Sequence, residues 1–243
     1  MEPPGRTLVI SDGGVAALVA CMAAREALYA GASAAAGAEP AKAGLEAARK
    51  NAEATRTFLR DRRPLVFMGE LPAGSGAARR KAVERQCAAL DLELVEPTPA
   101  DVPPSGAPAG ERATRLLVSA AFAAAKREAA RVLWPVHFFD GTDVNLDSVA
   151  DAIDRALLVT RLLGLDSQPG LRVEVPYADF TDRQLAELAV DLDAPVRTCW
   201  WWYAQLAPTP PGDSAGPDEF RAEFHRWNQV LRECGWVQEA GVA

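Results

Sequence analysis

The residues best suited to chemistry in this chain form a short run between an apolar segment and an alanine-rich one. The run reads SDGGV and lies within LVISDGGVAALVAC. A strand that turns at glycines into a helix points backbone N–H groups and a helix N-terminus at one place, which is how many proteins bind phosphate. The candidate nucleotide-binding residues are therefore Ser11, Asp12, Gly13, Gly14 and Val15.

The side chains of this loop do not suit a phosphate. Asp12 places a carboxylate at the rim, and Ala16 and Ala17 offer neither a hydroxyl group nor a metal ligand. Repulsion between like charges about 4 Å apart costs on the order of 1 to 4 kcal/mol for dielectrics between those of water and a protein surface. The alternative interpretation is that Gly13 and Gly14 serve only a tight strand-to-helix turn.

The loop resembles the fingerprint of the PP-loop ATP pyrophosphatases, Ser-Gly-Gly-x-Asp-Ser directly after the first strand, but it keeps only the two glycines. A second segment, LRVEVPYADFTDRQLAELAVDLDAPVRTCW over residues 171–200, is similar to the C-terminal half of 7-cyano-7-deazaguanine synthase. The positions that carry this second resemblance are Pro176, Thr181, Pro195, Thr198 and Trp200.

The resemblance implies an α/β fold of the adenine nucleotide alpha-hydrolase type, with a parallel five-stranded Rossmann-like sheet flanked by helices and a helical C-terminal extension. In this family ATP activates a carboxylate by adenylation with the help of magnesium, and ammonia converts the product to an amide and a nitrile. The resemblance places Asp140, Thr198 and Trp200 on the substrate side. Asp182 stands where the family has a lysine.

The cysteines do not match the zinc-binding run of the family. No two of them lie within ten residues of each other, so we expect no zinc and assign no metal ligands. Four separated cysteines indicate reduced thiols in a cytoplasmic protein rather than a disulfide framework. The cysteines are Cys21, Cys87, Cys199 and Cys234.

The loop keeps the glycines of the family but lacks its phosphate-binding and metal-binding side chains, which leaves three alternative functions. The first is a divergent relative of the synthase, a pseudoenzyme that binds a nucleotide-like ligand or a protein partner. The second is an active ATP-dependent C–N ligase that holds phosphate and magnesium through other residues, such as Asp140 or the arginines of residues 30–64. The third is an interaction module that binds no nucleotide and uses a tryptophan cluster.

The amino-acid composition and net charge limit the kinds of partner that this protein can bind. The chain has 243 residues, a net charge of −7 and 49% hydrophobic residues, which predicts one globular domain over residues 1–243. An acidic chain is poorly suited to nucleic acid or to an anionic membrane surface, since both attract cations. The alanine-rich stretch after the loop is interrupted by Arg25 and Glu26, so we expect no membrane span. A homodimer is compatible with the sequence.

Apolar runs alternate with helical patterns, which is typical of a parallel sheet with crossover helices. The predicted strands are residues 8–10, 65–68, 92–95, 132–139 and 171–175. The predicted helices are residues 15–29, 77–90, 111–131, 146–163, 181–192 and 218–234, with an extra basic helix in an insert over 30–64. A proline-rich loop is predicted over 96–110. Thr181 and Gln184 form a capping box.

The C-terminal region, residues 196–243, contains the run Trp200-Trp201-Trp202-Tyr203 before the last helix. Taken as extended, the run would alternate between two faces, so at least one tryptophan should face a cleft, a partner or solvent. The alternative is core packing against Phe220, Phe224 and Trp227 of the last helix. The two histidines, His137 and His225, show no spacing that indicates a catalytic triad or a metal site.

Overall fold

Five short apolar runs form the strands of one sheet in the computed structural model. The structure describes residues 5–36, 45–69, 75–97, 107–139, 141–165, 170–204 and 217–236. The strands are β1 (Arg6–Ser11), β2 (Leu65–Met68), β3 (Glu93–Val95), β4 (Ala129–Leu133) and β5 (Arg172–Glu174). All neighbours in the order β3-β2-β1-β4-β5 pair in parallel. The predicted α/β class is confirmed, and the fold is Rossmann-like.

The strand order reverses beside β1. From β1 the chain moves outward through β2 to β3, and then crosses back to place β4 on the other side of β1. In parallel sheets the carboxyl ends of the two strands at such a reversal leave a crevice, because the following loops diverge to opposite faces. The turn after Ser11 and the segment after Leu133 therefore face each other across this crevice.

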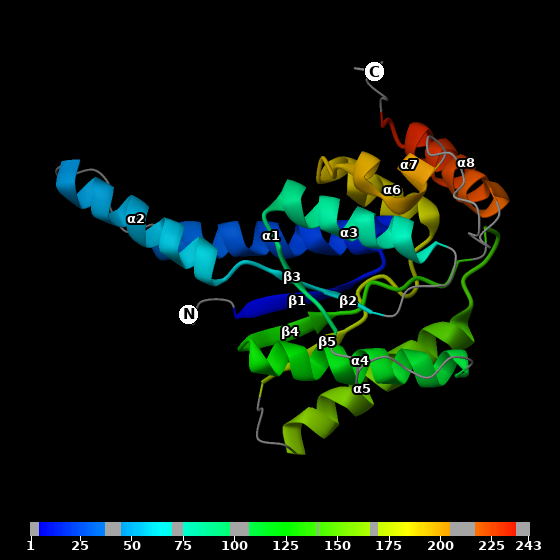
Figure 1. Ribbon diagram of the computed structural model, residues 1–243, viewed down its shortest axis with the longest axis horizontal. Helices are drawn as coiled ribbons and strands as arrows, with labels where there is room; N and C mark the ends of the chain where they lie inside the picture. The colour runs from blue at the N-terminus through cyan, green and yellow to red at the C-terminus, as the bar shows by residue number, and fades with distance from the viewer. Residues whose placement is uncertain are drawn as a thin grey trace.

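Helices cover both faces of the sheet (Figure 1). The first face carries α1 (Val15–Ala36), α3 (Gly76–Leu90), α6 (Asp182–Asp191), α7 (Trp200–Ala204) and α8 (Pro217–Glu233), and the second carries α4 (Ala109–Lys126) and α5 (Leu146–Leu165). In Figure 1, α2 (Leu45–Asp61) extends away from this body beside the far end of α1.

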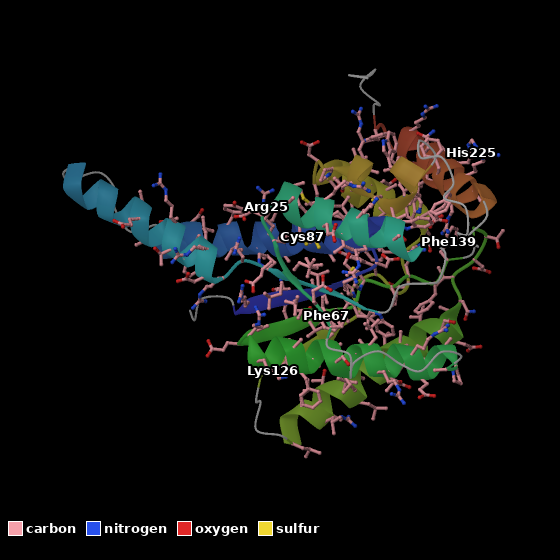
Figure 2. All side chains as sticks on the ribbon, viewed as in Figure 1. Arg25, Phe67, Cys87, Lys126, Phe139 and His225 are labelled. Carbon is pink, nitrogen blue, oxygen red and sulfur yellow. The ribbon has the colours of Figure 1, made fainter. Side chains whose placement is uncertain are left out.

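Two hydrophobic cores result from the alternation of side chains along the strands. Val9 and Val66 point to the core under α1 and α3, while Leu8 and Phe67 point to the core under α4 and α5. Figure 2 shows Phe67 in the interior between the sheet and α4. β1 and β2 are buried nearly throughout, as expected for central strands of a sheet covered on both faces.

Several helix and strand boundaries differ from the predictions. The first helix does not end at residue 29 but continues to Ala36, because the single Gly31 costs only about 1 kcal/mol relative to alanine and is surrounded by alanines, the best helix formers. The fourth helix ends at Lys126, and Glu128 adopts a positive φ of 55°, so β4 begins at Ala129. β4 ends at Leu133, two residues before Pro135, which has no N–H to donate to a neighbouring strand.

The prediction of an extended tryptophan run is wrong. After Pro195 the chain forms a 3-10 turn, η2 (Val196–Thr198), and then the short helix α7. Trp200, Trp201 and Trp202 are only 3%, 0% and 8% exposed. Side chains of consecutive helical residues diverge by about 100°, and α7 lies against both α3 and α8, so all three can be buried.

One part of α1, Val15–Ser33, is long and apolar enough to cross a membrane by length and composition. It lies near the N-terminus, and 61% of the segment is buried inside the fold. Its apolar side chains pack on β1 and α6, which accounts for its composition as a core helix.

Candidate functional site

A cleft of about 210 Å³ opens at the carboxyl ends of β1 and β4, at the reversal of the strand order. Its floor is the end of β1 and the first turn of α1. Its walls come from other parts of the chain: Gly69 after β2, Arg79 of α3, Leu116 of α4, the residues from Trp134 to His137 after β4, and the C-terminal helices α7 and α8. The lining is mainly apolar, with polar groups from the loop of residues 11–15 and from the side chains of Arg79, His137 and Glu223.

The glycine loop is held from behind by α3 and α7. Gly13 has a φ of 78°, and its carbonyl oxygen accepts hydrogen bonds from Gln86 Nε2 at 3.2 Å and from the Trp200 N–H at 3.1 Å. A Cβ atom at this position would lie 2.9 Å from the Cβ of Ala82. Glycine is therefore required here both by backbone conformation and by the close approach of α3.

Asp12 binds two donors that lie at the glycine loop. Its Oδ1 accepts a hydrogen bond from the Gly14 N–H at 2.9 Å, and its Oδ2 pairs with Arg79 Nη1 at 2.6 Å. The Gly13 N–H donates to Ser11 Oγ at 3.1 Å. Two of the loop's backbone donors are thus satisfied by side chains from within the loop, and the carboxylate also neutralises the nearest arginine.

Arg79 is held in place on three sides. Besides Asp12, it donates from Nε to Ser75 Oγ at 3.0 Å, and its Cζ lies 4.1 Å from the ring centroid of Trp200. A guanidinium group over the face of a tryptophan is attracted by the ring quadrupole. The Arg79 side chain is therefore fixed over Trp200, where its ion pair holds the Asp12 carboxylate in place.

A second polar group closes the opposite wall. His137 Nε2 lies 3.2 Å from Asp182 Oδ1, and Arg226 of α8 binds both oxygens of Asp182, at 2.5 and 2.6 Å. Burial raises the pKa of Asp182, but hydrogen bonds from His137 and Arg226 and their charges outweigh it and hold this pKa below its ordinary value. Asp182 thus fixes one ring nitrogen of His137, which lines the cleft.

The residues named from the resemblance are placed as follows. Trp200 lines the cleft, as do Ser11, Asp12, Gly14 and Val15. Gly13 lies behind them, and Thr198 donates its hydroxyl to the Pro195 carbonyl at 2.7 Å and does not line the cleft. Asp140 lies outside the described residues.

Other cleft residues were missed by the sequence analysis. The polar ones are Arg79 and Glu223. Trp227, expected only to pack in the core, also lines the cleft and donates from Nε1 to Glu223 Oε1 at 2.8 Å. Arg79 had a signal, because it shares a helix face with Ala82, Val83 and Gln86 at helical spacing. The α8 residues had none, since their role depends on where the last helix docks.

A magnesium-bound triphosphate does not fit this arrangement. Asp12 already uses the Gly14 N–H and Arg79, and Ala16 lines the cleft without a ligand atom. Among the residues that the structure describes, no group of three His, Cys, Asp or Glu side chains could hold a metal ion.

Fold and cleft together define a Rossmann-like α/β protein with a candidate binding site at the strand-order reversal. No protein-family model matches the chain, and no curated protein is significantly similar to it.

Proposed function

We propose that this protein is a divergent relative of 7-cyano-7-deazaguanine synthase that no longer adenylates a substrate and that binds a compact nucleobase-like or nucleoside-like ligand in the cleft. The observation that carries the proposal is the position of Asp12. Its carboxylate takes the place of a phosphate on the Gly14 N–H and on Arg79. Catalysis of adenylation depends on positioning and neutralising phosphate charge, and this loop offers a negative charge instead.

The lining of the cleft favours a small, uncharged heterocycle. Apolar side chains such as Ile10, Leu116 and Trp134 supply most of the surface, and Ser11 and His137 supply polar atoms that can orient a ligand. Ligand sites of this kind combine an apolar lining with a few placed polar groups. A nucleobase or nucleoside fits this pattern better than a triphosphate, because it brings no charge to repel Asp12.

The direct test is calorimetric titration of the purified protein with adenosine, guanosine, pyrophosphate and ATP with magnesium. We expect at least one of the two nucleosides to bind, and we expect pyrophosphate and ATP with magnesium to show no stronger binding than the uncharged probes. Binding of ATP with magnesium at least tenfold tighter than either nucleoside would overturn the proposal and favour an active ATP-dependent ligase.

Asp12→Ser tests the role of the carboxylate. The substitution removes the like charge and leaves the Gly14 N–H and Arg79 available, so pyrophosphate should bind roughly tenfold to a thousandfold more tightly. Adding Ala16→Asp and Ala17→Ser should make this binding depend on magnesium. The matched control is Asp191→Ser, which removes an exposed carboxylate at the far end of α6 and should leave the titrations unchanged.

The tryptophan run is a weaker candidate for function. Trp201 and Trp202 pack on Phe224 of α8, with ring centroids 5.9 and 5.5 Å away. Their burial supports the alternative of core packing and leaves little of these rings to bind another protein. We therefore do not propose an interaction module built on this run.

A further inference from the structure

The outward face of α5 carries a row of exposed leucine and isoleucine side chains. The inward face, with Ala152, Ala156, Val159 and Leu163, packs on the sheet. The outward side chains are 43% to 81% exposed, whereas large apolar side chains on a protein surface usually occur singly. They are Leu146, Ile153, Leu157, Leu158, Leu162 and Leu165.

Two charged residues lie in the middle of this apolar face. Asp154 and Arg161 are seven residues apart, so they project in nearly the same direction two turns from each other. Both are exposed, and neither forms an ion pair with another residue in the described part of the chain. At two turns, about 10 Å, they are also too far apart to pair with each other.

The face is complementary to itself when a second copy of α5 is laid across it in the antiparallel direction. With the two-fold axis level with the midpoint between Leu157 and Leu158, each of these leucines meets its own copy beside the axis, because the two side chains lie on different flanks of the face. Asp154 then meets Arg161 of the second copy in both directions, because both lie near the middle of the face. Ile153 and Leu162 are nine residues apart and project to opposite sides of the helix, so they flank the contact. A two-fold interface requires this reciprocity, in which residue i contacts j and j contacts i.

We propose that the protein forms a homodimer through the outward faces of two antiparallel α5 helices, centred between Leu157 and Leu158. The occupant is a second copy because one register brings leucine against leucine beside the axis and each aspartate against an arginine. A partner with an all-apolar groove would leave Asp154 and Arg161 without counter-charges at the centre of the contact, which is costly. The dimer does not depend on what the cleft binds.

The first experiment measures mass by light scattering and sedimentation velocity on the full chain at tens of micromolar. We expect twice the chain mass of 25.9 kDa for the wild type. Leu158→Glu should give the monomer mass, with a dissociation constant raised at least about tenfold, because it places carboxylates beside the two-fold axis. Leu158 is 64% exposed, so the thermal melt of the variant should show an intact fold.

The charged pair gives a second test that does not alter the apolar surface. Asp154→Arg sets two arginines against each other across the axis, and Arg161→Asp sets two aspartates against each other, so each alone should weaken the dimer. The double variant D154R/R161D restores opposite charges in the same register and should recover the dimer. Glu53→Arg, the same charge change on exposed α2, is the matched control and should remain dimeric.

Three results would overturn the proposal. One is a wild type that is monomeric at every concentration, including a monomer that sediments with phospholipid vesicles and so uses the face on a membrane surface. Another is a dimer that persists in Leu158→Glu, which would place the contact elsewhere. The third is a double variant that stays as weak as the single ones, which would refute the antiparallel register.

Discussion

Asp182 joins two parts of the chain that build one wall of the cleft. Its carboxylate binds His137, which follows β4, and Arg226 of the last helix. The side chain is 4% exposed, so its charge is largely removed from water and depends on these two partners. A buried carboxylate is stable in this setting only while its hydrogen bonds are present.

Asp182→Asn should lower the free energy of unfolding by about 2 kcal/mol at neutral pH, because Arg226 loses its nearest counter-charge and keeps only Glu223, 3.7 Å away. In the folded protein the pKa of Asp182 is below its ordinary value, so the wild type gains this stability at neutral pH and loses it as pH falls below about 4. Urea denaturation at neutral and at acidic pH measures both effects.

The difference between wild type and Asp182→Asn should therefore narrow in acid. Asp191→Asn, at an exposed position on the same helix, should match the wild type at both pH values. Equal stabilities of wild type and Asp182→Asn at neutral pH would show that the ion pair with Arg226 contributes nothing to the fold.

At the scale of single residues, the sequence predicts contacts between residues close together in the chain but not contacts between residues far apart in it. The loop of residues 11–15 and the capping box of Thr181 and Gln184 were predicted, because each depends on residues within a few positions. His137 and Arg226 are 45 and 44 residues from Asp182. No local pattern marks such a cluster, so it becomes visible only when the chain is folded.

At the scale of elements, α7 shows how a local turn overrides a propensity. Aromatic residues favour strands, and the tryptophan run was interpreted as extended. Pro195 instead leads into the 3-10 turn η2, whose cap N–H from Cys199 donates to Val196, and this turn starts a helix. The helix places Trp200 against Phe220 and Trp202 against Trp236 in one aromatic core.

Truncation of any one of Trp200, Trp201 and Trp202 to alanine should be severely destabilising. Each side chain is more than nine-tenths buried, and loss of a buried tryptophan costs about 3 to 5 kcal/mol. Thermal melts and urea denaturation of the three single variants measure the effect. Phe122→Ala on α4, where the aromatic ring is 43% exposed, is the control and should cost far less.

A truncation that leaves stability within about 0.5 kcal/mol of wild type would contradict the packing of α7. It would return that tryptophan to the surface and reopen a binding role for it. Trp201→Ala is the most stringent case, because Trp201 is fully buried.

At the scale of the whole molecule, the alternation of strands and helices predicts a parallel sheet, and this was confirmed. The order of the strands could not be predicted from this alternation, because it depends on which crossover passes back over β1. The proline-rich segment 96–110, most of which lies outside the described residues, makes the connection at which the order reverses. The position of the cleft follows from that reversal.

The purified protein should contain no stoichiometric zinc. Metals bind thiolates, and burial raises the pKa of Cys87 to about 11 and raises those of Cys21 and Cys199 further, which keeps all three as neutral thiols. Elemental analysis after gel filtration measures the metal content. One zinc per chain would require a ligand set that includes residues outside the described part of the structure.

Because Asp12 accepts the hydrogen bond of the Gly14 N–H, any phosphate that binds this loop must compete with the Asp12 carboxylate. A carboxylate tethered two residues away acts at an effective concentration that reaches millimolar values or more even for flexible tethers, and Arg79 restricts it further. A free phosphate must displace this internal group, so its apparent affinity falls by the ratio of that effective concentration to the dissociation constant of the internal contact. We therefore expect phosphate-bearing metabolites to compete with a group that is part of the protein itself, and ligands without a phosphate to avoid this competition.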